Sequence, residues 1–155
     1  MAGVSNISTM AKEKKDTVTL IIDAKGLILG RMASYAASQA MLGQDVAIVN
    51  CEEAIISGKK ESIIKKYQQR MARGSIRTGP FHPRPADRIV RRVVRGMLDY
   101  NSYHGRKAFQ RVMCYCGVPS DFAGKAMTVP QGMDAGKLPV LKFVKVKDIC
   151  KVIGG

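Results

Sequence analysis

A strand–helix–strand pattern near the amino terminus is the feature that most limits how this chain can fold. Residues 17–24 form a run of β-forming side chains, and residues 45–51 form a second short apolar run. Between them, residues 29–41 place seven apolar side chains at helical spacing, four of them alanines, and Gly43 follows where a helix would end. Parallel neighbouring strands need a crossover connection, so this unit predicts a parallel sheet with a closely packed helix.

The connection between the first strand and its helix argues against a dinucleotide site. Residues 26–30 read Gly-Leu-Ile-Leu-Gly, with bulky side chains where the G-x-G-x-x-G fingerprint lets the backbone approach a pyrophosphate. Residues 57–60 read Ser-Gly-Lys-Lys, like the end of a phosphate-binding loop that lacks its upstream glycine. We interpret both segments as turns, the second one basic.

Positive charge is concentrated between residues 70 and 111. This segment holds ten arginines and one lysine against two acids, and so supplies +9 of the formal net charge of +14. Fourteen of the fifteen lysines lie elsewhere, and Arg31 is the only arginine outside the segment. Guanidinium groups present a planar fork of donors to phosphate oxygens and stack on bases. This segregation favours a polyphosphate partner over a general role in solubility.

Residues 86–98 predict an amphipathic helix, which Pro85 can open at its first helical position. The apolar stripe consists of Ala86, Ile89, Val90, Val93, Val94, Met97 and Leu98. The opposite face, expected to point outward, carries Arg88, Arg91, Arg92 and Arg95. Like charges at these spacings repel by a few tenths of a kcal/mol per pair. An ordinary solvated face is the simplest interpretation of such a helix, but uncompensated repulsion favours a polyanion as its partner.

The remaining elements follow from shorter patterns. Residues 61–72 and 105–111 predict helices, and residues 112–116 predict a strand. Residues 117–139 are rich in Gly and Pro and are expected to cover the surface or meet a partner. Residues 148–154 predict a helical turn at the carboxyl end. The basic loop before the helix at residues 86–98 contains three prolines and two glycines, and its backbone freedom is restricted. This restriction lowers the entropy cost of ordering the loop on binding, so we interpret the loop as a site where RNA docks.

Length and composition predict a single domain, residues 17–155, after a disordered polar tail, residues 1–16. No apolar run approaches the roughly 18 residues of a membrane span, and the amino terminus lacks a signal-peptide core, so we expect a cytoplasmic protein. No cofactor or metal is expected. The cysteines do not form paired C-x-x-C knuckles and are interpreted as small buried hydrophobic residues: Cys51, Cys114, Cys116 and Cys150.

Residues 94–117, VRGMLDYNSYHGRKAFQRVMCYCG, combine a basic-Gly-Met-aliphatic core, a spaced Gly-Arg and an aliphatic-x-x-Tyr-x-Gly ending. In this the chain resembles the universal family of large-subunit ribosomal protein thirteen. Residues 23–34 and 46–60 agree as well, and residues 79–85, GPFHPRP, resemble the archaeal and eukaryotic branch. Asp99 departs from the Pro, Ser or Thr that is usual there, and the carboxyl-terminal helix looks abbreviated.

The resemblance implies an α/β fold with three layers, α/β/α, around a mostly parallel sheet of about four strands. It implies a structural constituent of the large ribosomal subunit, not an enzyme, that binds rRNA beside neighbouring ribosomal proteins and supports subunit assembly and translation. The residues that it places at rRNA are Lys59, Lys60, Arg73, Arg77, His82, Arg84, Arg88, Arg91, Arg92, Arg95, Arg106, Lys107 and Arg111. Arg31 is a lesser candidate, and Tyr100, Tyr103 and His104 are candidates for stacking on exposed bases.

Two other classes of function remain open at this point. An α/β nucleotide-dependent enzyme acting on RNA would need a convergent acid, base or nucleophile, whereas both histidines lie among arginines and the acids are scattered. A basic amphipathic helix can also dock on an anionic membrane, but such helices favour Trp, Phe and Leu, and the chain has no Trp. Liposome flotation compared with RNA gel shift separates the membrane class from the RNA class.

Overall fold

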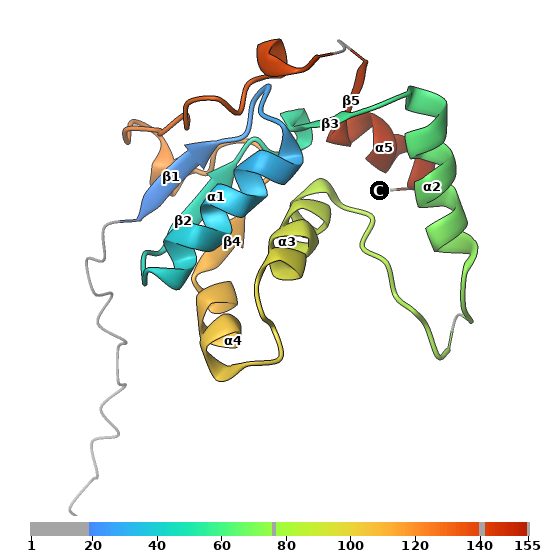
Figure 1. The fold of residues 1–155 in the computed structure, drawn as a ribbon, viewed down its shortest axis with the longest axis horizontal. Coiled ribbons are helices and arrows are strands. Elements are labelled where there is room, and N and C mark those ends of the chain that lie inside the picture. The colour runs from blue at the N-terminus through green and yellow to red at the C-terminus, as the bar shows by residue number, and fades with distance from the viewer. Residues whose placement is uncertain (1–18, 76, 140–141, 155) are drawn as a thin grey trace, which may run out of the picture.

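The computed structural model describes the chain in three pieces (Figure 1), residues 19–75, 77–139 and 142–154. The tail expected at residues 1–16 lies outside the described residues, as do the first two residues of the expected first strand. Among the described residues, no helix has both the length and the apolar composition needed to cross a bilayer.

A three-stranded parallel sheet lies at the centre of the fold, in the order β1 (Leu20–Asp23), β2 (Val46–Val49), β4 (Val112–Cys114). Leu20 pairs with Val46, which pairs in turn with Val112, so the strands begin level with one another. The α/β class, the mostly parallel sheet and the parallel pairing of the first two strands are confirmed.

The crossover from β1 to β2 is α1 (Leu29–Met41), with the bounds that its sequence pattern predicted. Its buried face is rich in alanine, and short side chains let the helix lie close to its neighbours. Gly43 ends it with a φ of 99°, which a residue with a side chain rarely adopts, and its N–H donates to Ala40 O at 3.1 Å.

Two further helices, α3 (Ala86–Met97) and α4 (Tyr103–Gln110), contact α1 and complete the largest core cluster. Ile22 and Ile48 of the sheet meet Val90 and Val94 of α3 in this cluster, and all four are fully buried. The predicted amphipathic helix is therefore confirmed. Its first helical residue is Ala86, however, with Pro85 as the cap before it, and Met97 is 43% exposed.

The opposite face of the sheet is covered differently. Ile21, Ala47 and Val49 pack there against Tyr115 and against Phe122, which belongs to a short 3-10 turn. The segment rich in Gly and Pro continues along the edge of β1, where the N–H of residue 128 donates to Ile21 O at 2.7 Å. Within the described residues, the segment forms an isolated parallel bridge here instead of a fourth strand of the expected sheet. Its Gly and Pro residues do not sustain a regular strand.

A second, two-stranded antiparallel sheet pairs β3 (Ile55–Ser57) with β5 (Phe143–Lys145). The helices that follow these strands, α2 (Lys60–Ala72) and α5 (Val146–Ile153), pack against each other beside the main sheet (Figure 1). Their shared cluster contains Ile63, Val144 and Ile149. The last helix begins two residues before the helical turn that its sequence predicted, residues 148–154, and ends one residue before that turn does. Three 3-10 turns complete the elements: η1 (Cys51–Glu53), η2 (Ser120–Phe122) and η3 (Ala135–Lys137).

The cysteines are free thiols, and two of the four are buried as predicted. Burial raises the pKa of Cys150 to about 11, and a hydrogen bond with Cys114 is the main cause of the raised pKa of Cys51. The prediction of burial was wrong for Cys116, which is exposed, and Cys114 is only half-buried. The reason is that β4 ends at Cys114, so the two alternate residues do not share one buried strand face.

Candidate nucleic-acid interface

The outer face of α3 carries a row of exposed guanidiniums. Arg88, Arg92 and Arg95 are spaced by four and three residues, so they lie along one side of the helix while Val90 and Val94 are buried on the other. Arg92 Nη1 donates to the carbonyl oxygen of Phe81 at 2.8 Å. This bond ties the row to the basic loop before the helix.

That loop, residues 74–85, begins with a narrow turn. Ser75 and Gly79 exchange two backbone hydrogen bonds of 3.2 and 2.9 Å. Gly74 has a φ of 92°, and a Cβ there would come within 2.5 Å of Pro80 Cδ, so the turn requires glycine. Three exposed arginines belong to this region: Arg73 just before the loop, Arg77 within the turn, and Arg84 just before α3. His82, between the turn and α3, is half-buried.

Cation–π contacts join α3 to the α4 region. The Arg91 guanidinium carbon lies 4.7 Å from the ring centroid of Phe109, and that of Arg95 lies 4.0 Å from Tyr100. These two rings meet edge to face with centroids 5.5 Å apart. Tyr100 is therefore engaged within the protein. Tyr103 is 62% exposed, and its ring contacts Lys107 and His104.

The predicted outward position of Arg91 is wrong. Its side chain is half-buried against Phe109, and its Nε is buried without a hydrogen-bond partner among the described residues. The helical pattern correctly separates the two faces of α3. It does not show that α4 packs against the flank on which Arg91 lies.

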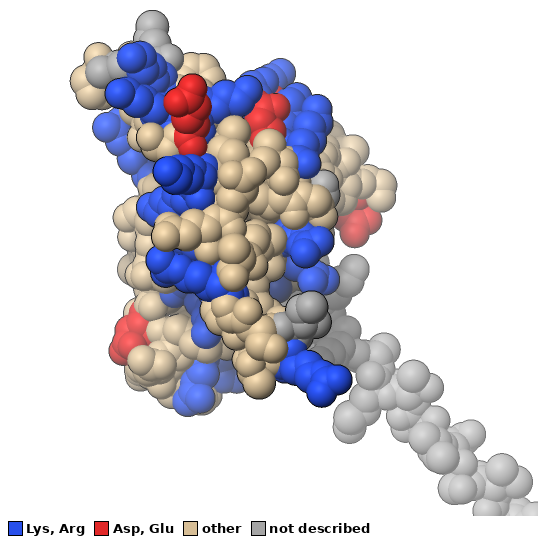
Figure 2. All heavy atoms as spheres, turned by 90° about the vertical axis from the view of Figure 1, so that its right-hand side faces the viewer, with Lys and Arg blue, Asp and Glu red and all other residues tan. Residues whose placement is uncertain are grey.

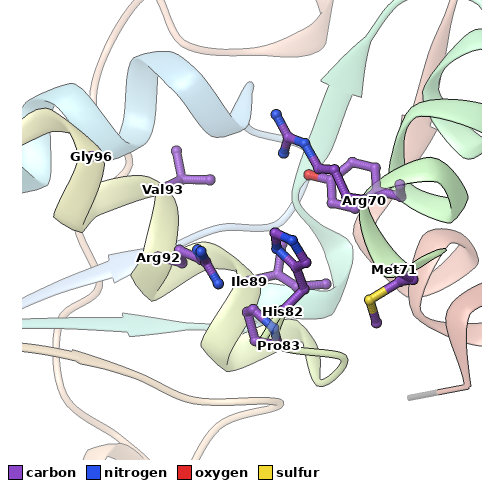
Figure 3. Close-up of a pocket in the computed structure, with 9 residues that line it drawn as sticks. Arg70, Met71, His82, Pro83, Ile89, Arg92, Val93 and Gly96 are labelled. Carbon is purple, nitrogen blue, oxygen red and sulfur yellow. The ribbon is translucent and has the colours of Figure 1, made fainter. Parts of the chain in front are cut away.

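A cavity of about 440 Å³ opens between α2, the loop and α3 (Figure 3). Its polar lining comes from Arg70, His82 and Arg92, with His82 lying between the two arginines. Burial, and then the nearby guanidiniums of Arg92, Arg70 and Arg73, lower the pKa of His82. Val93 lines this cavity and is only half-buried, whereas the next residue, Val94, is fully buried in the core.

No arginine pairs with an acidic side chain in the part of the chain that the structure describes. Among the described residues, the ion pairs within 4.0 Å are those of Glu53 with Lys145 Nζ at 2.6 Å and with Lys147 Nζ at 2.8 Å, and neither involves an arginine. These lysines lower the pKa of Glu53 to about 2. Figure 2 views the side that carries α2 and shows many basic side chains with few acidic ones between them. The arginines of α3 and of the basic loop therefore keep their charge available to a partner.

The structure does not bring all thirteen predicted residues together. Lys59 and Lys60 lie at the opposite end of α2 from Arg70, about 15 Å away at 1.5 Å per helical residue, in a surface hollow that Lys142 also lines. Arg111 is half-buried, and its Nη1 donates to Ala40 O at 3.4 Å, at the end of α1.

The other basic side chains named from the sequence fall on different elements. Arg106 and Lys107 are exposed on α4. Arg31 donates to Gly132 O at 3.1 Å on another part of the surface. We did not infer from the sequence that Arg70 lines the cavity or that the ring of Phe109 supports the Arg91 guanidinium. Arg70 follows the inward-facing Tyr67 by one helical turn, which was a usable signal, whereas no local pattern marks Phe109.

Comparisons with known proteins give a consistent result. The sequence model of the family described as Ribosomal protein L13 matches residues 17–121. A protein of Archaeoglobus fulgidus is 40% identical over 150 residues, which cover 96% of each chain. One of Haloarcula marismortui is 39% identical over 135 residues, covering 87% of this chain and 90% of its own. One of Methanosarcina barkeri is 38% identical over 135 residues, covering 86% and 96%. Each of the three relatives is named large ribosomal subunit protein uL13.

Proposed function

The chain belongs to the ribosomal protein L13 family, and from that premise we propose that it is a structural constituent of the large ribosomal subunit in the cytoplasm. Its work is binding, not catalysis: it contacts rRNA and other proteins of the subunit and supports assembly and translation. The enzyme alternative has no support, because His82 lies between two guanidiniums (Figure 3) and His104 lies against Tyr103.

One observation carries the assignment of the RNA-binding surface. The arginine row of α3 is exposed and is free of carboxylate partners among the described residues. Double-helical RNA presents phosphates and 2′-hydroxyls, and its major-groove base edges are out of reach of side chains. A row of guanidiniums on a rigid helix suits such a backbone, because each group can fork onto phosphate oxygens.

We assign the contacts with the sugar-phosphate backbone to the exposed groups around this row. They are Arg73, Arg77, Arg84, Arg88, Arg92, Arg95, Arg106 and Lys107. Lys59 and Lys60 form a second contact point at the far end of α2. Arg91 and Arg111 act mainly by holding α3 and the end of α1 in place, since both are half-buried and have partners within the protein.

A salt titration tests the surface assignment. Six to eight neutralised phosphates give a log–log slope of affinity against salt of about −4 to −7. Replacing Arg88 and Arg95 with Gln is expected to weaken binding to an rRNA fragment and to make the slope shallower by about two. The matched control replaces two exposed lysines elsewhere, Lys125 and Lys151, with Gln. An equal loss in the control, or a slope near zero for the unaltered chain, would refute the assignment.

The assignment to the large subunit is tested in cells. A tagged copy is expected to sediment with large subunits on a sucrose gradient, and the Arg88/Arg95 double variant is expected to shift toward free protein at the top. A tagged wild-type chain found only at the top of the gradient would contradict the proposed function.

A further inference from the structure

The cavity between α2 and α3 has a lining that a surface for backbone phosphates does not need. We propose that it receives a single RNA nucleotide that has left its stack, with the base inside and its phosphate bound by the polar side chains of Arg70, His82 and Arg92. This proposal rests on the proposed function, because it makes the cavity a specific part of the RNA-binding surface. The volume of about 440 Å³ lies within the range of small-molecule sites.

The polar side of the cavity suits a phosphate. Arg70 comes from α2 and Arg92 from α3, so two guanidiniums border one space. No acidic side chain is found among the described residues that line it. Arg92 is held in position by its 2.8 Å bond to Phe81 O. His82 lies between the two arginines, and its lowered pKa keeps it available as a neutral hydrogen-bonding group.

The apolar side suits a base. Met71, Pro83, Ile89 and Val93 form the walls, and Tyr67 adds an aromatic ring. Proteins that bind unpaired RNA combine a basic groove with apolar or aromatic surfaces for the base faces. One side of the cavity carries two cationic side chains and the other side is apolar, which matches the phosphate and the base of a nucleotide. An acidic peptide would match the cationic side but would leave the apolar walls without a contact.

Gly96 allows the cavity to be filled without any change of charge. It lines the cavity from α3, and a Cβ built on it meets nothing within 4 Å. Gly96→Leu places a branched side chain there, whereas Gly96→Ala leaves most of the space open. Both replacements favour the helix by similar amounts relative to glycine, so the two variants differ mainly in the volume that they occupy.

The probe is an RNA hairpin with a single-nucleotide bulge, compared with the same hairpin without the bulge and with one whose bulged position is abasic. The complete wild-type chain and Gly96→Ala are expected to prefer the bulged hairpin by roughly tenfold, the scale of one base contact in single-strand complexes. Gly96→Leu and the abasic bulge are each expected to abolish this preference, while affinity for the unbulged hairpin stays within twofold. Arg70→Gln is expected to reduce the preference, and its control on the same helix, Lys66→Gln, is not.

The outcomes separate this inference from the function on which it rests. Equal affinity of the wild-type chain for bulged and unbulged hairpins would overturn the nucleotide site and leave the arginine surface standing. A preference that survives Gly96→Leu, or competition by an Asp-Glu peptide but not by a nucleoside monophosphate, would also overturn it. Absence of binding to any hairpin would contradict the proposed function itself.

Discussion

Replacing Gly105 with alanine gives a sharp test of how α4 is seated. Gly105 is buried in the first turn of α4, where a Cβ would lie 2.5 Å from the carbonyl carbon of Asp99 and closer still to its oxygen. Carbon atoms in van der Waals contact are about 3.5–4.0 Å apart. The variant therefore requires the Asp99 peptide to move away from the helix by about 1 Å.

The size of the effect follows from what that movement disturbs. Asp99 O accepts hydrogen bonds from Ser102 N at 3.2 Å and from Ser102 Oγ at 2.9 Å, and the same Oγ caps the helix by accepting from Gly105 N at 3.0 Å. Strain of about 1–3 kcal/mol and the weakening of two hydrogen bonds of about 1 kcal/mol each oppose a helix-propensity gain of about 1 kcal/mol. We expect a net loss of about 2–4 kcal/mol in the free energy of unfolding.

Urea unfolding followed by circular dichroism measures this difference, and the midpoint of thermal unfolding is expected to fall by roughly 5–15 °C. The matched control is Gly96→Ala, also within a helix, where a Cβ meets nothing within 4 Å. It is expected to raise stability by about 0.4–1 kcal/mol. If Gly105→Ala were as stable as the wild-type chain, the close approach of α4 to Asp99 would be refuted, and the turn after α3 would have another conformation.

Three further comparisons test other parts of the structure. Arg91→Ala is expected to lower the free energy of unfolding by about 1–2 kcal/mol, because the Arg91 guanidinium packs on the ring of Phe109. Arg88→Ala removes an exposed side chain and is expected to lower it by less than about 0.5 kcal/mol. Equal urea midpoints for the two variants would contradict the contact between Arg91 and Phe109. Val94→Asp buries an unpaired charge and is expected to unfold the chain. Val93→Asp faces a cavity with two guanidiniums, so this variant is expected to remain folded when measured by circular dichroism. If Val93→Asp unfolded and Val94→Asp did not, the two positions would be misassigned. The pKa of Glu53 is lowered from 4.5 to about 2, so its ion pairs stabilise the fold above pH 4.5 and this contribution is lost as the pH falls toward 2. The difference in stability between the wild-type chain and Glu53→Gln is therefore expected to shrink over this pH range. A difference that stayed constant would contradict the pairing.

Much of the fold follows from local sequence patterns. The bounds of α1 were predicted correctly because an alanine-rich stripe with helical period ends at Gly43, whose φ of 99° favours glycine. The two faces of α3 were predicted for the same reason, since a helix fixes the angle between successive side chains. The parallel sheet followed from the crossover that such a helix makes.

The rest depends on packing between distant segments, which one sequence does not encode locally. The three-residue strands β3 and β5 pair across about 90 positions and carry no pattern long enough to reveal their pairing. The contact of Arg91 with Phe109 and the cavity beside Val93 depend on where α4 and α2 come to lie against α3. The charge of the candidate site was therefore predictable, but its shape was not.

The antiparallel pairing of β3 with β5 has a consequence for the order in which the molecule forms during its own synthesis. At about 5–20 residues added per second, β3 waits roughly 5–20 s before its partner has been translated. During this interval β1, α1 and β2 can assemble, whereas α2 lacks Val144 and Ile149, which cover its inner side. The nascent chain can thus pair the first two strands of its parallel sheet early, whereas the inner side of α2, which provides one wall of the cavity, is covered only when the last segment arrives.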